Sequence, residues 1–172
     1  MPTLPSTPSP SSDADLGLAA LRLCVRRNTL PPGRALERRV EIRLRVPTEL
    51  DVVEEAVDLV ARHCLACGLS ARAARFNLRV ALSEALANAI IYGNRLDPAK
   101  SVDVRVVVSD RGLTLHVSDQ GDGFDPDAIP DPTLPDRREL EDGRGLFLIR
   151  QLVDEVRFND RGNAICMVLR RA

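Results

Sequence analysis

The sequence predicts an α+β fold, a two-layer sandwich in which a mostly antiparallel sheet carries three main helices on one face. Two observations lead to this fold class. Short segments with alternating apolar and charged residues recur from residue 40 onward, which is typical of half-buried strands. Two longer stretches with apolar residues at helical spacing follow the first strand, and strands and helices grouped in this way favour a two-layer architecture.

Length and charge bound the kind of protein. The chain has 172 residues, which suits one domain with a tail, and its formal net charge of −1 does not favour a nucleic-acid or membrane surface. No apolar run reaches the roughly 18 residues of a membrane span. Acidic residues precede the short apolar stretch near the N-terminus, so we expect no secretory signal and a cytoplasmic protein.

The N-terminal part differs in composition from the rest of the chain. Residues 1–15 are rich in proline, serine and threonine, so we expect a disordered tail. Residues 16–39 form an accessory segment to which we assign no structure, and the main domain spans 40–172. Eight arginines lie from Arg22 to Arg45. They form either a docking face for an acidic partner or a solvated surface, and the solvated surface is favoured.

The main domain begins with a strand and a helix. Residues 40–46 alternate as a half-buried strand that Pro47 ends. Thr48, followed three residues later by Asp51, is close to a capping box and predicts the start of a helix. That helix ends at Gly68, where a glycine is the usual stop.

A second helix and a hairpin come next. Ser70 caps the helix, which runs to about Tyr92 and stops at Gly93. Residues 101–108 and 113–118 then read as two strands around a glycine-containing turn.

The C-terminal part contains a long loop, a helix and a last hairpin. Residues 124–142 hold four prolines and many acidic residues, and their apolar residues follow neither the period of a helix nor that of a strand. We therefore expect a loop, and loops of this length are usually functional. A helix follows over about 145–154, and the last strands lie near 156–158 and 164–169.

The cysteines allow two interpretations. Cys64 and Cys67 form a CxxC beside His63, which is compatible with zinc or redox chemistry. No second CxxC or histidine pair completes a tetrahedral site, and Cys24 and Cys166 are distant in the sequence. A structural role at the end of an apolar helix is therefore favoured.

Three polar or glycine-bearing motifs are candidates for chemistry. Glu84 and Asn88 lie four residues apart and project from one face of the second helix; an exposed polar stripe is the alternative. Asp119 ends a strand and is followed by Gly121 and Gly123, where a carboxylate can accept a hydrogen bond from an exocyclic amine and glycines let the backbone approach a flat ring. An ordinary Asp-Gly turn is the alternative, but a proline-rich loop follows instead of a strand.

The third motif begins the third helix. Gly143-Arg144-Gly145-Leu146 offers free backbone N–H groups, and helix N-termini bind phosphate through such groups. A flexible lid hinge is a compatible alternative. Lys100 is the only lysine and has no Gly-Lys-Ser/Thr around it, which excludes the phosphate-loop ATPases.

Together, these motifs give the chain a family resemblance. Residues 40–170 resemble the Bergerat-type ATP-binding domain shared by gyrase, the chaperone of that superfamily, histidine kinases and mismatch-repair ATPases. The three boxes of that superfamily resemble Glu84-x-x-x-Asn88-Ala89, Asp119-x-Gly121-x-Gly123 and Gly143-x-Gly145-Leu146. The short format and the run GRGLFLIRQLVDEV are most similar to the bacterial anti-sigma factor serine/threonine kinases.

The resemblance implies cofactors and residue roles. ATP and Mg²⁺ would be bound, with Asn88 coordinating Mg²⁺, Glu84 acting as general base and Asp119 binding the adenine amino group. A lid over about 125–142 would close on the nucleotide. The remaining ATP-binding residues would be Gly121, Gly123, Gly143, Arg144, Gly145 and Leu146.

The resemblance also implies a function and partners. The protein would be a homodimeric anti-sigma regulatory kinase that binds a sigma factor and phosphorylates an anti-anti-sigma antagonist, without direct nucleic-acid or membrane contact. One alternative is an ATP-gated binding module with little phosphotransfer. The other is a detached histidine kinase catalytic domain, which is disfavoured because no helical hairpin with an exposed phosphoacceptor histidine precedes the domain.

Overall fold

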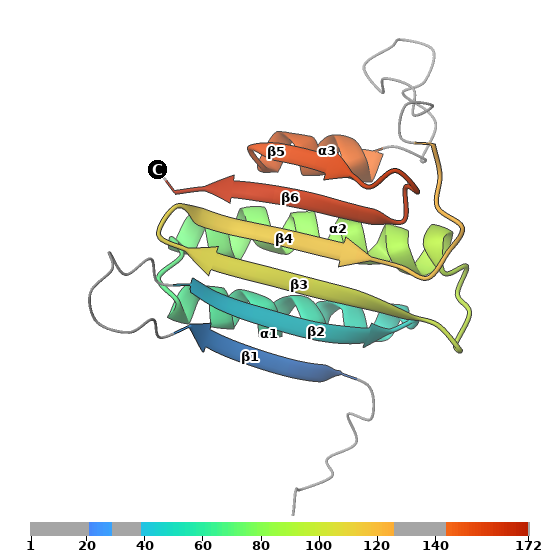
Figure 1. Cartoon of the computed structure of the whole chain (residues 1–172), viewed down its shortest axis with the longest axis horizontal. Helices are drawn as coiled ribbons and strands as arrows, with labels where there is room; N and C mark the ends of the chain where they lie inside the picture. The colour runs from blue at the N-terminus through green and yellow to red at the C-terminus, as the bar shows by residue number, and fades with distance from the viewer. Residues whose placement is uncertain (1–20, 29–38, 126–143, 172) are drawn as a thin grey trace, which may run out of the picture.

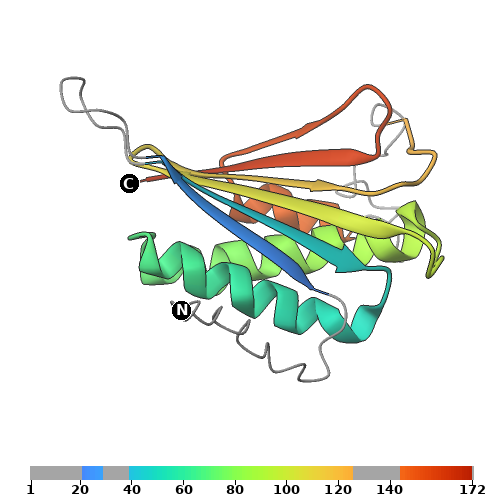
Figure 2. The same ribbon diagram turned by 60° about the horizontal axis from the view of Figure 1, so that its bottom comes forward.

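A six-stranded antiparallel sheet forms one layer of the structure, and three helices cover one of its faces (Figures 1 and 2). The structure is a computed structural model that describes residues 21–28, 39–125 and 144–171. The predicted tail, most of the accessory segment, the lid from residue 126 onward and Gly143 lie outside the described residues. The predicted α+β two-layer fold is confirmed.

The sheet has the strand order β1-β2-β3-β4-β6-β5, and every neighbouring pair is antiparallel. The strands are β1 (Arg22–Asn28), β2 (Arg39–Pro47), β3 (Ser101–Ser109), β4 (Gly112–Ser118), β5 (Glu155–Phe158) and β6 (Ala164–Arg170). The helical elements are η1 (Leu50–Val52), α1 (Val53–Ala66), η2 (Ala73–Asn77), α2 (Leu78–Asn88), η3 (Ala89–Gly93) and α3 (Arg144–Leu152). Predicted and observed elements agree to within a few residues at their ends.

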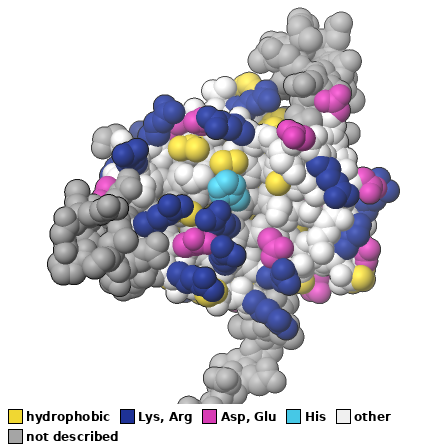
Figure 3. Space-filling model, viewed as in Figure 1, with side chains coloured by type: hydrophobic (Ala, Val, Ile, Leu, Met, Phe, Trp, Pro, Cys, Tyr) yellow, Lys and Arg dark blue, Asp and Glu magenta, His cyan; other side chains and the backbone are white. Residues whose placement is uncertain are grey.

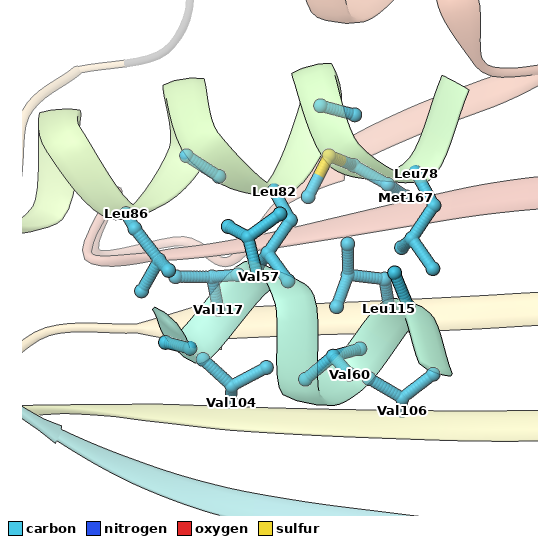
Figure 4. Packing of buried hydrophobic residues seen from close by; sticks show 14 of the residues in the cluster. Val57, Val60, Leu78, Leu82, Leu86, Val104, Val106, Leu115, Val117 and Met167 are labelled. Atoms are coloured by element: carbon cyan, nitrogen blue, oxygen red, sulfur yellow. The ribbon is translucent and has the colours of Figure 1, made fainter. Parts of the chain in front are cut away.

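The hydrophobic core lies between the sheet and the helices (Figure 4). Side chains of β3 and β4 that point toward the helices alternate with residues on the opposite face, as the period of a strand requires. Burial of each large aliphatic side chain stabilises the fold by about 1.5–3 kcal/mol. Central members of this core are Val57, Val60, Leu82, Leu86, Val104, Val106, Leu115 and Val117.

Strand β1 comes from the accessory segment to which the sequence assigned no structure. It pairs with β2, with Val25 opposite Ile42, so the sheet begins upstream of residue 40. β1 is an edge strand, and its Leu23 and Val25 remain 37% exposed on the helix side. This partial burial allows arginines among the apolar residues, which hides the alternating pattern.

The predicted capping box at Thr48 is wrong. The Thr48 hydroxyl donates to the Lys100 carbonyl (2.8 Å) and accepts a hydrogen bond from the Asn94 amide (3.0 Å). Neither η1 nor α1 has a side-chain hydrogen bond at its N-terminus. The Thr48 side chain therefore connects distant segments, which local spacing cannot reveal.

The junction between the first two helices follows the sequence prediction. Gly68 has a φ of 85°, and the N–H of Leu69 donates to the Cys64 carbonyl (3.1 Å), as in a glycine-ended helix. The Ser70 hydroxyl accepts a hydrogen bond from the N–H of Ala73 (3.2 Å). The helix that Ser70 begins contains two π-helical turns, η2 and η3, on either side of α2.

Cys64 belongs to the core at this junction. It is fully buried, and burial raises the pKa of its thiol to about 12. All four cysteines are free thiols. Within the described residues, no three His, Cys, Asp or Glu side chains group in a way that could hold a metal ion.

Helix α3 packs against α2 and completes the helical layer. The Asn77 amide donates to the Leu152 carbonyl (2.7 Å), so the end of α3 is tied to the turn that precedes α2. Among the helices of the three described ranges, none has the length and apolar character needed to cross a membrane.

A pH-dependent link between strands β2 and β3 yields a prediction. Glu41 accepts hydrogen bonds from Arg105 (3.0 Å) and Arg43 (2.6 Å), and these bonds lower the Glu41 pKa from 4.5 to about 2. A lowered pKa stabilises the fold above pH 4.5, and this contribution disappears as the pH falls toward 2. Because Arg43 is exposed and Arg105 is half-exposed, water screens both pairs, and Glu41→Gln should cost at most about 1 kcal/mol near neutral pH.

Urea unfolding at a series of pH values would measure the difference between wild type and Glu41→Gln. The two proteins should converge in stability toward the acid end of the series. An equal difference at every pH at which both are folded would show that the carboxylate charge is not the cause.

Candidate functional site

The first and third motifs meet on the face of α2 that carries Glu84 and Asn88. Both side chains are half-buried. A Cβ atom added to Gly145, at the start of α3, would lie 2.5 Å from Glu84 Oε2 and 3.5 Å from Asn88 Nδ2. The absence of a side chain at Gly145 therefore allows the backbone of α3 to approach the carboxylate.

The second motif meets the same helix one to two turns further on. A Cβ at Gly93 would lie 2.4 Å from Asp119 Cγ, and a Cβ at Gly121 would lie 2.1 Å from the Gly93 carbonyl oxygen. The helix ends at Gly93, as the sequence predicts, but Gly93 does not have the positive φ of a usual glycine stop. Its lack of a side chain instead makes room for the Asp119 carboxylate.

The three motifs are thus arranged in a row along one helix. Glu84 and Gly93 are nine residues apart, which corresponds to about 13 Å along a helix axis. Glycine backbone and half-buried polar groups line both ends of this row. An elongated ligand with a charged end and a flat polar end matches such an arrangement.

The Asp119 carboxylate is held in place by the loop that it begins. Its Oδ1 accepts a hydrogen bond from the N–H of Gly121 (2.8 Å), and its backbone exchanges hydrogen bonds with Asn163 (3.0 and 3.2 Å). Burial raises the Asp119 pKa, and the Gly121 N–H together with the charges of Lys100 and Arg161 partly offsets this effect. This half-buried carboxylate can accept a further hydrogen bond, because a carboxylate has about four acceptor positions.

Asn94 is a site residue that the sequence prediction missed. It is fully buried, its amide N donates to Thr48 Oγ1 (3.0 Å) and to the Ser101 carbonyl (3.1 Å), and its Oδ1 accepts from the N–H of Gln120 (2.8 Å). Gln120 Oε1 in turn accepts from the N–H of Ser101 (2.7 Å). Asn94 therefore joins the end of the helix to the loop that carries Asp119. Its one signal in the sequence is its place directly after the glycine that ends the helix.

A strained turn follows Asn94. Arg95 and Leu96 have φ values of 57° and 56°, a left-handed conformation that costs non-glycine residues about 1–2 kcal/mol each. The N–H of Leu96 donates to the Ile90 carbonyl (2.9 Å), which closes the helix end. Strain of this kind concentrates at functional sites.

The end of the second motif packs against the β5–β6 hairpin. Gly123 has a φ of 81°, and a Cβ there would lie 1.8 Å from the Arg161 carbonyl oxygen. The rings of Phe124 and Phe158 meet edge to face at 5.3 Å. Gly123 is thus required by contact between two chain segments, whereas the sequence prediction explained it by approach to a ligand ring.

The remaining predicted site residues lie at the start of α3. Arg144 is exposed and Leu146 is half-buried. Gly143 belongs to the part of the chain that is not described. The structure therefore brings together Glu84, Asn88 and Gly145 at one end of the row and Asp119 and Gly121 at the other.

Comparisons with known proteins show what the chain is similar to. Residues 46–169 match the family described as the histidine kinase-like ATPase domain. The serine-protein kinase RsbW of Bacillus licheniformis is 37% identical over 101 residues, which cover 53% of this chain and 61% of that protein. RsbW of Oceanobacillus iheyensis is 29% identical over 98 residues, 54% of this chain and 62% of that protein.

Anti-sigma F factors are also similar to this chain. The anti-sigma F factor of Geobacillus stearothermophilus is 35% identical over 81 residues, which cover 46% of this chain and 56% of that protein. The chain spans about three fifths of the length of the relatives it matches.

The buried hydrogen bonds of Asn94 yield a prediction. Asn94→Ala leaves the N–H of Gln120 and the Ser101 carbonyl without these partners, so the free energy of unfolding should fall by about 2–4 kcal/mol. Urea unfolding would measure the loss. Asn159→Ala, which removes a similar side chain at an exposed turn, serves as the control and should cost less than about 1.5 kcal/mol. Equal losses in the two variants would contradict the role assigned to Asn94.

Proposed function

Because the chain belongs to the histidine kinase-like ATPase domain family, we propose that it binds ATP and transfers the terminal phosphate to a hydroxyl group of a protein substrate. The observation that carries this proposal is the row of motifs along α2, with Gly145 against Glu84 and Asp119 against Gly93. The names of its relatives, a serine-protein kinase and an anti-sigma F factor, support a regulatory role in transcription.

The charged end of the row fits a phosphate chain with its metal ion. The Asn88 side-chain carbonyl is an oxygen donor of the type that Mg²⁺ prefers. Gly145 has no side chain, so the start of α3 lies directly beside Glu84 and Asn88. Bound Mg²⁺ would be held by Asn88 and would offset the negative charge of the phosphate oxygens. The N–H groups at the start of α3 favour phosphate through the helix dipole.

The other end of the row fits adenine. The half-buried Asp119 carboxylate can accept a hydrogen bond from the exocyclic amine of the ring. Gly93 and Gly121 carry no side chains, so the helix end and the loop of Asp119 pack closely together and hold this carboxylate in place. Asn94 keeps the loop of Asp119 in register with the helix through its bond to Gln120.

In this proposal, Glu84 is the general base. As the hydroxyl oxygen of the substrate attacks the γ-phosphorus, Glu84 takes the hydroxyl proton, the bond to the leaving oxygen breaks and ADP is released. The position of Glu84 one helical turn from Asn88 puts the base next to the phosphate-binding residues. The Glu84 carboxylate is a proton acceptor suited to this step.

The family of relatives suggests the biological partners. The protein would bind a sigma factor and phosphorylate an anti-anti-sigma antagonist on serine or threonine, so that phosphorylation controls which partner is held. A homodimer acting in the cytoplasm belongs to the same proposal. An ATP-gated binding module without phosphotransfer is the competing function, and the tests below separate the two.

Removal of the proposed base should stop transfer but leave nucleotide binding intact. With γ-labelled ATP and candidate anti-anti-sigma proteins from the same genome, Glu84→Ala should lower the rate of labelling by about 10²–10⁴-fold. Glu54→Ala, an exposed glutamate on α1, is the matched control and should label at the wild-type rate. Labelling by Glu84→Ala at the wild-type rate would refute the role of base. A wild-type protein that binds ATP and labels no candidate would favour the binding module.

Substitution of Asp119 should separate nucleotide binding from stability. In Asp119→Asn the side-chain oxygen can still accept the Gly121 N–H, and the burial of a charged group is relieved. The melting temperature should therefore stay the same or rise, whereas ATP affinity measured by calorimetry should fall about 10–100-fold. Asp122→Asn, at an exposed carboxylate three residues further on, should change neither quantity. Unchanged ATP affinity in Asp119→Asn would remove Asp119 from the adenine site.

A further inference from the structure

The face of the sheet opposite the helices carries a concentration of arginine side chains (Figure 3). In β2, β3 and β6 these residues alternate with the buried residues, so they lie on the face opposite the core. Strand register places Arg22 and Arg26 of β1 and Arg157 of β5 on the same face, opposite Arg45, Glu41 and Cys166. We call this surface the arginine face. Its arginines are Arg22, Arg26, Arg39, Arg43, Arg45, Arg105, Arg157 and Arg170. Its carboxylates are Glu41, Asp103 and Glu155.

The charge of this face differs from that of the whole chain. Eight arginines against three carboxylates leave an excess of five positive charges, whereas the chain as a whole has 24 basic and 25 acidic residues. The arginines come from five strands, including Arg105, Arg157 and Arg170, which are far in sequence from the N-terminal cluster. The fold therefore gathers positive charge on one surface, and the sequence interpretation of a merely solvated local cluster does not account for this.

The carboxylates of the face do not reach all of its arginines. Glu41 pairs with Arg43 and Arg105, Asp103 with Arg45, and Glu155 with Arg157 and Arg170. Three arginines of the face are exposed and have no acidic partner among the described residues: Arg22, Arg26 and Arg39. All three lie on β1 and the adjoining start of β2.

The middle of the face is less polar than its rim. Val107 is buried, and the neighbouring Cys166, Val168 and Thr114 are half-buried around His116. His116 Nε2 lies 3.8 Å from Cys166 Sγ, and burial together with the charge of Arg105 lowers the His116 pKa, which favours a neutral ring. A weakly polar centre inside a rim rich in arginine is the composition of protein–protein interfaces.

We propose that the arginine face docks an acidic protein surface. Carboxylates of the partner pair with Arg22, Arg26 and Arg39, and its apolar side chains cover the centre around His116 and Val107. This surface is separate from the nucleotide site, because the sheet lies between the arginine face and α2. The inference does not depend on the proposed kinase activity.

Charge also decides against other occupants. A second copy of the chain placed face to face would set two surfaces of the same sign against each other. Nucleic acid and the headgroup layer of an anionic membrane present phosphate charge but no apolar side chains to cover the weakly polar centre around His116 and Val107. A protein with an acidic rim and an apolar centre matches both parts of the surface.

A fluorescein-labelled synthetic peptide of alternating glutamate and leucine residues would test the proposal by fluorescence anisotropy. The first variant of the full chain combines Arg22→Gln, Arg26→Gln and Arg39→Gln. The control variant makes the same change at the exposed Arg62, Arg75 and Arg150 of the helical layer, so that both variants lose equal charge.

The wild type should bind the peptide at low salt, and rising salt should weaken the binding. The first variant should lose about tenfold or more in affinity and the control less than about twofold, because only the first alters the rim of the docking surface. Lysine at the same three positions should restore binding in large part. Circular dichroism would check that each variant is folded. ATP affinity should be equal in the wild type and all variants, and this expectation holds whether or not the protein transfers phosphate.

Several results would overturn the proposal. One is no peptide binding by the wild type, and another is an equal loss in the two glutamine variants. A third is that duplex DNA or anionic vesicles bind more tightly than the peptide, and that only the first variant loses this binding. A fourth is a dimer in sedimentation that only the first variant dissociates, because that result would assign the face to a second copy of the chain.

Discussion

The close approach between the end of the central helix and the end of β4 is the constraint on which the rest of the site depends. A Cβ at Gly93 would lie 2.4 Å from Asp119 Cγ, and a Cβ at Gly121 would lie 2.1 Å from the Gly93 carbonyl oxygen. The hydrogen bonds of Asn94 hold this contact together. Because Glu84 and Asn88 lie on the same helix, the contact sets the distance between the two ends of the candidate nucleotide site.

The candidate site lowers the stability of the fold, whereas the core beneath it raises that stability. Two successive non-glycine residues adopt left-handed backbone conformations, and a carboxylate is partly buried with a raised pKa. The aliphatic layer between the sheet and the helices offsets these costs, since each large buried side chain contributes about 1.5–3 kcal/mol. In the proposed function, a bound nucleotide would donate a hydrogen bond to the half-buried carboxylate and offset part of these costs.

The sheet separates two surfaces with different properties. The helical side holds the row of motifs, with glycine backbone and half-buried polar groups. The opposite side presents the arginine face, where three carboxylates bridge neighbouring strands and three arginines remain without an acidic partner in the described ranges. A partner on the arginine face would therefore leave the nucleotide site accessible.

The sequence by itself determined the fold class, most of the strands and helices and the motifs, because these depend on the period of apolar residues and on glycines at element ends. Glu84 and Asn88 follow from spacing on one helix, and Asp119 from its position after a strand. Only the tertiary structure decided which hydrogen bonds the Thr48 and Asn94 side chains make, because their partners lie in segments distant in the sequence. The same holds for the arginine face, since it requires strand register across five strands. Strand β1 was missed because an edge strand is buried too little to impose a clear alternation.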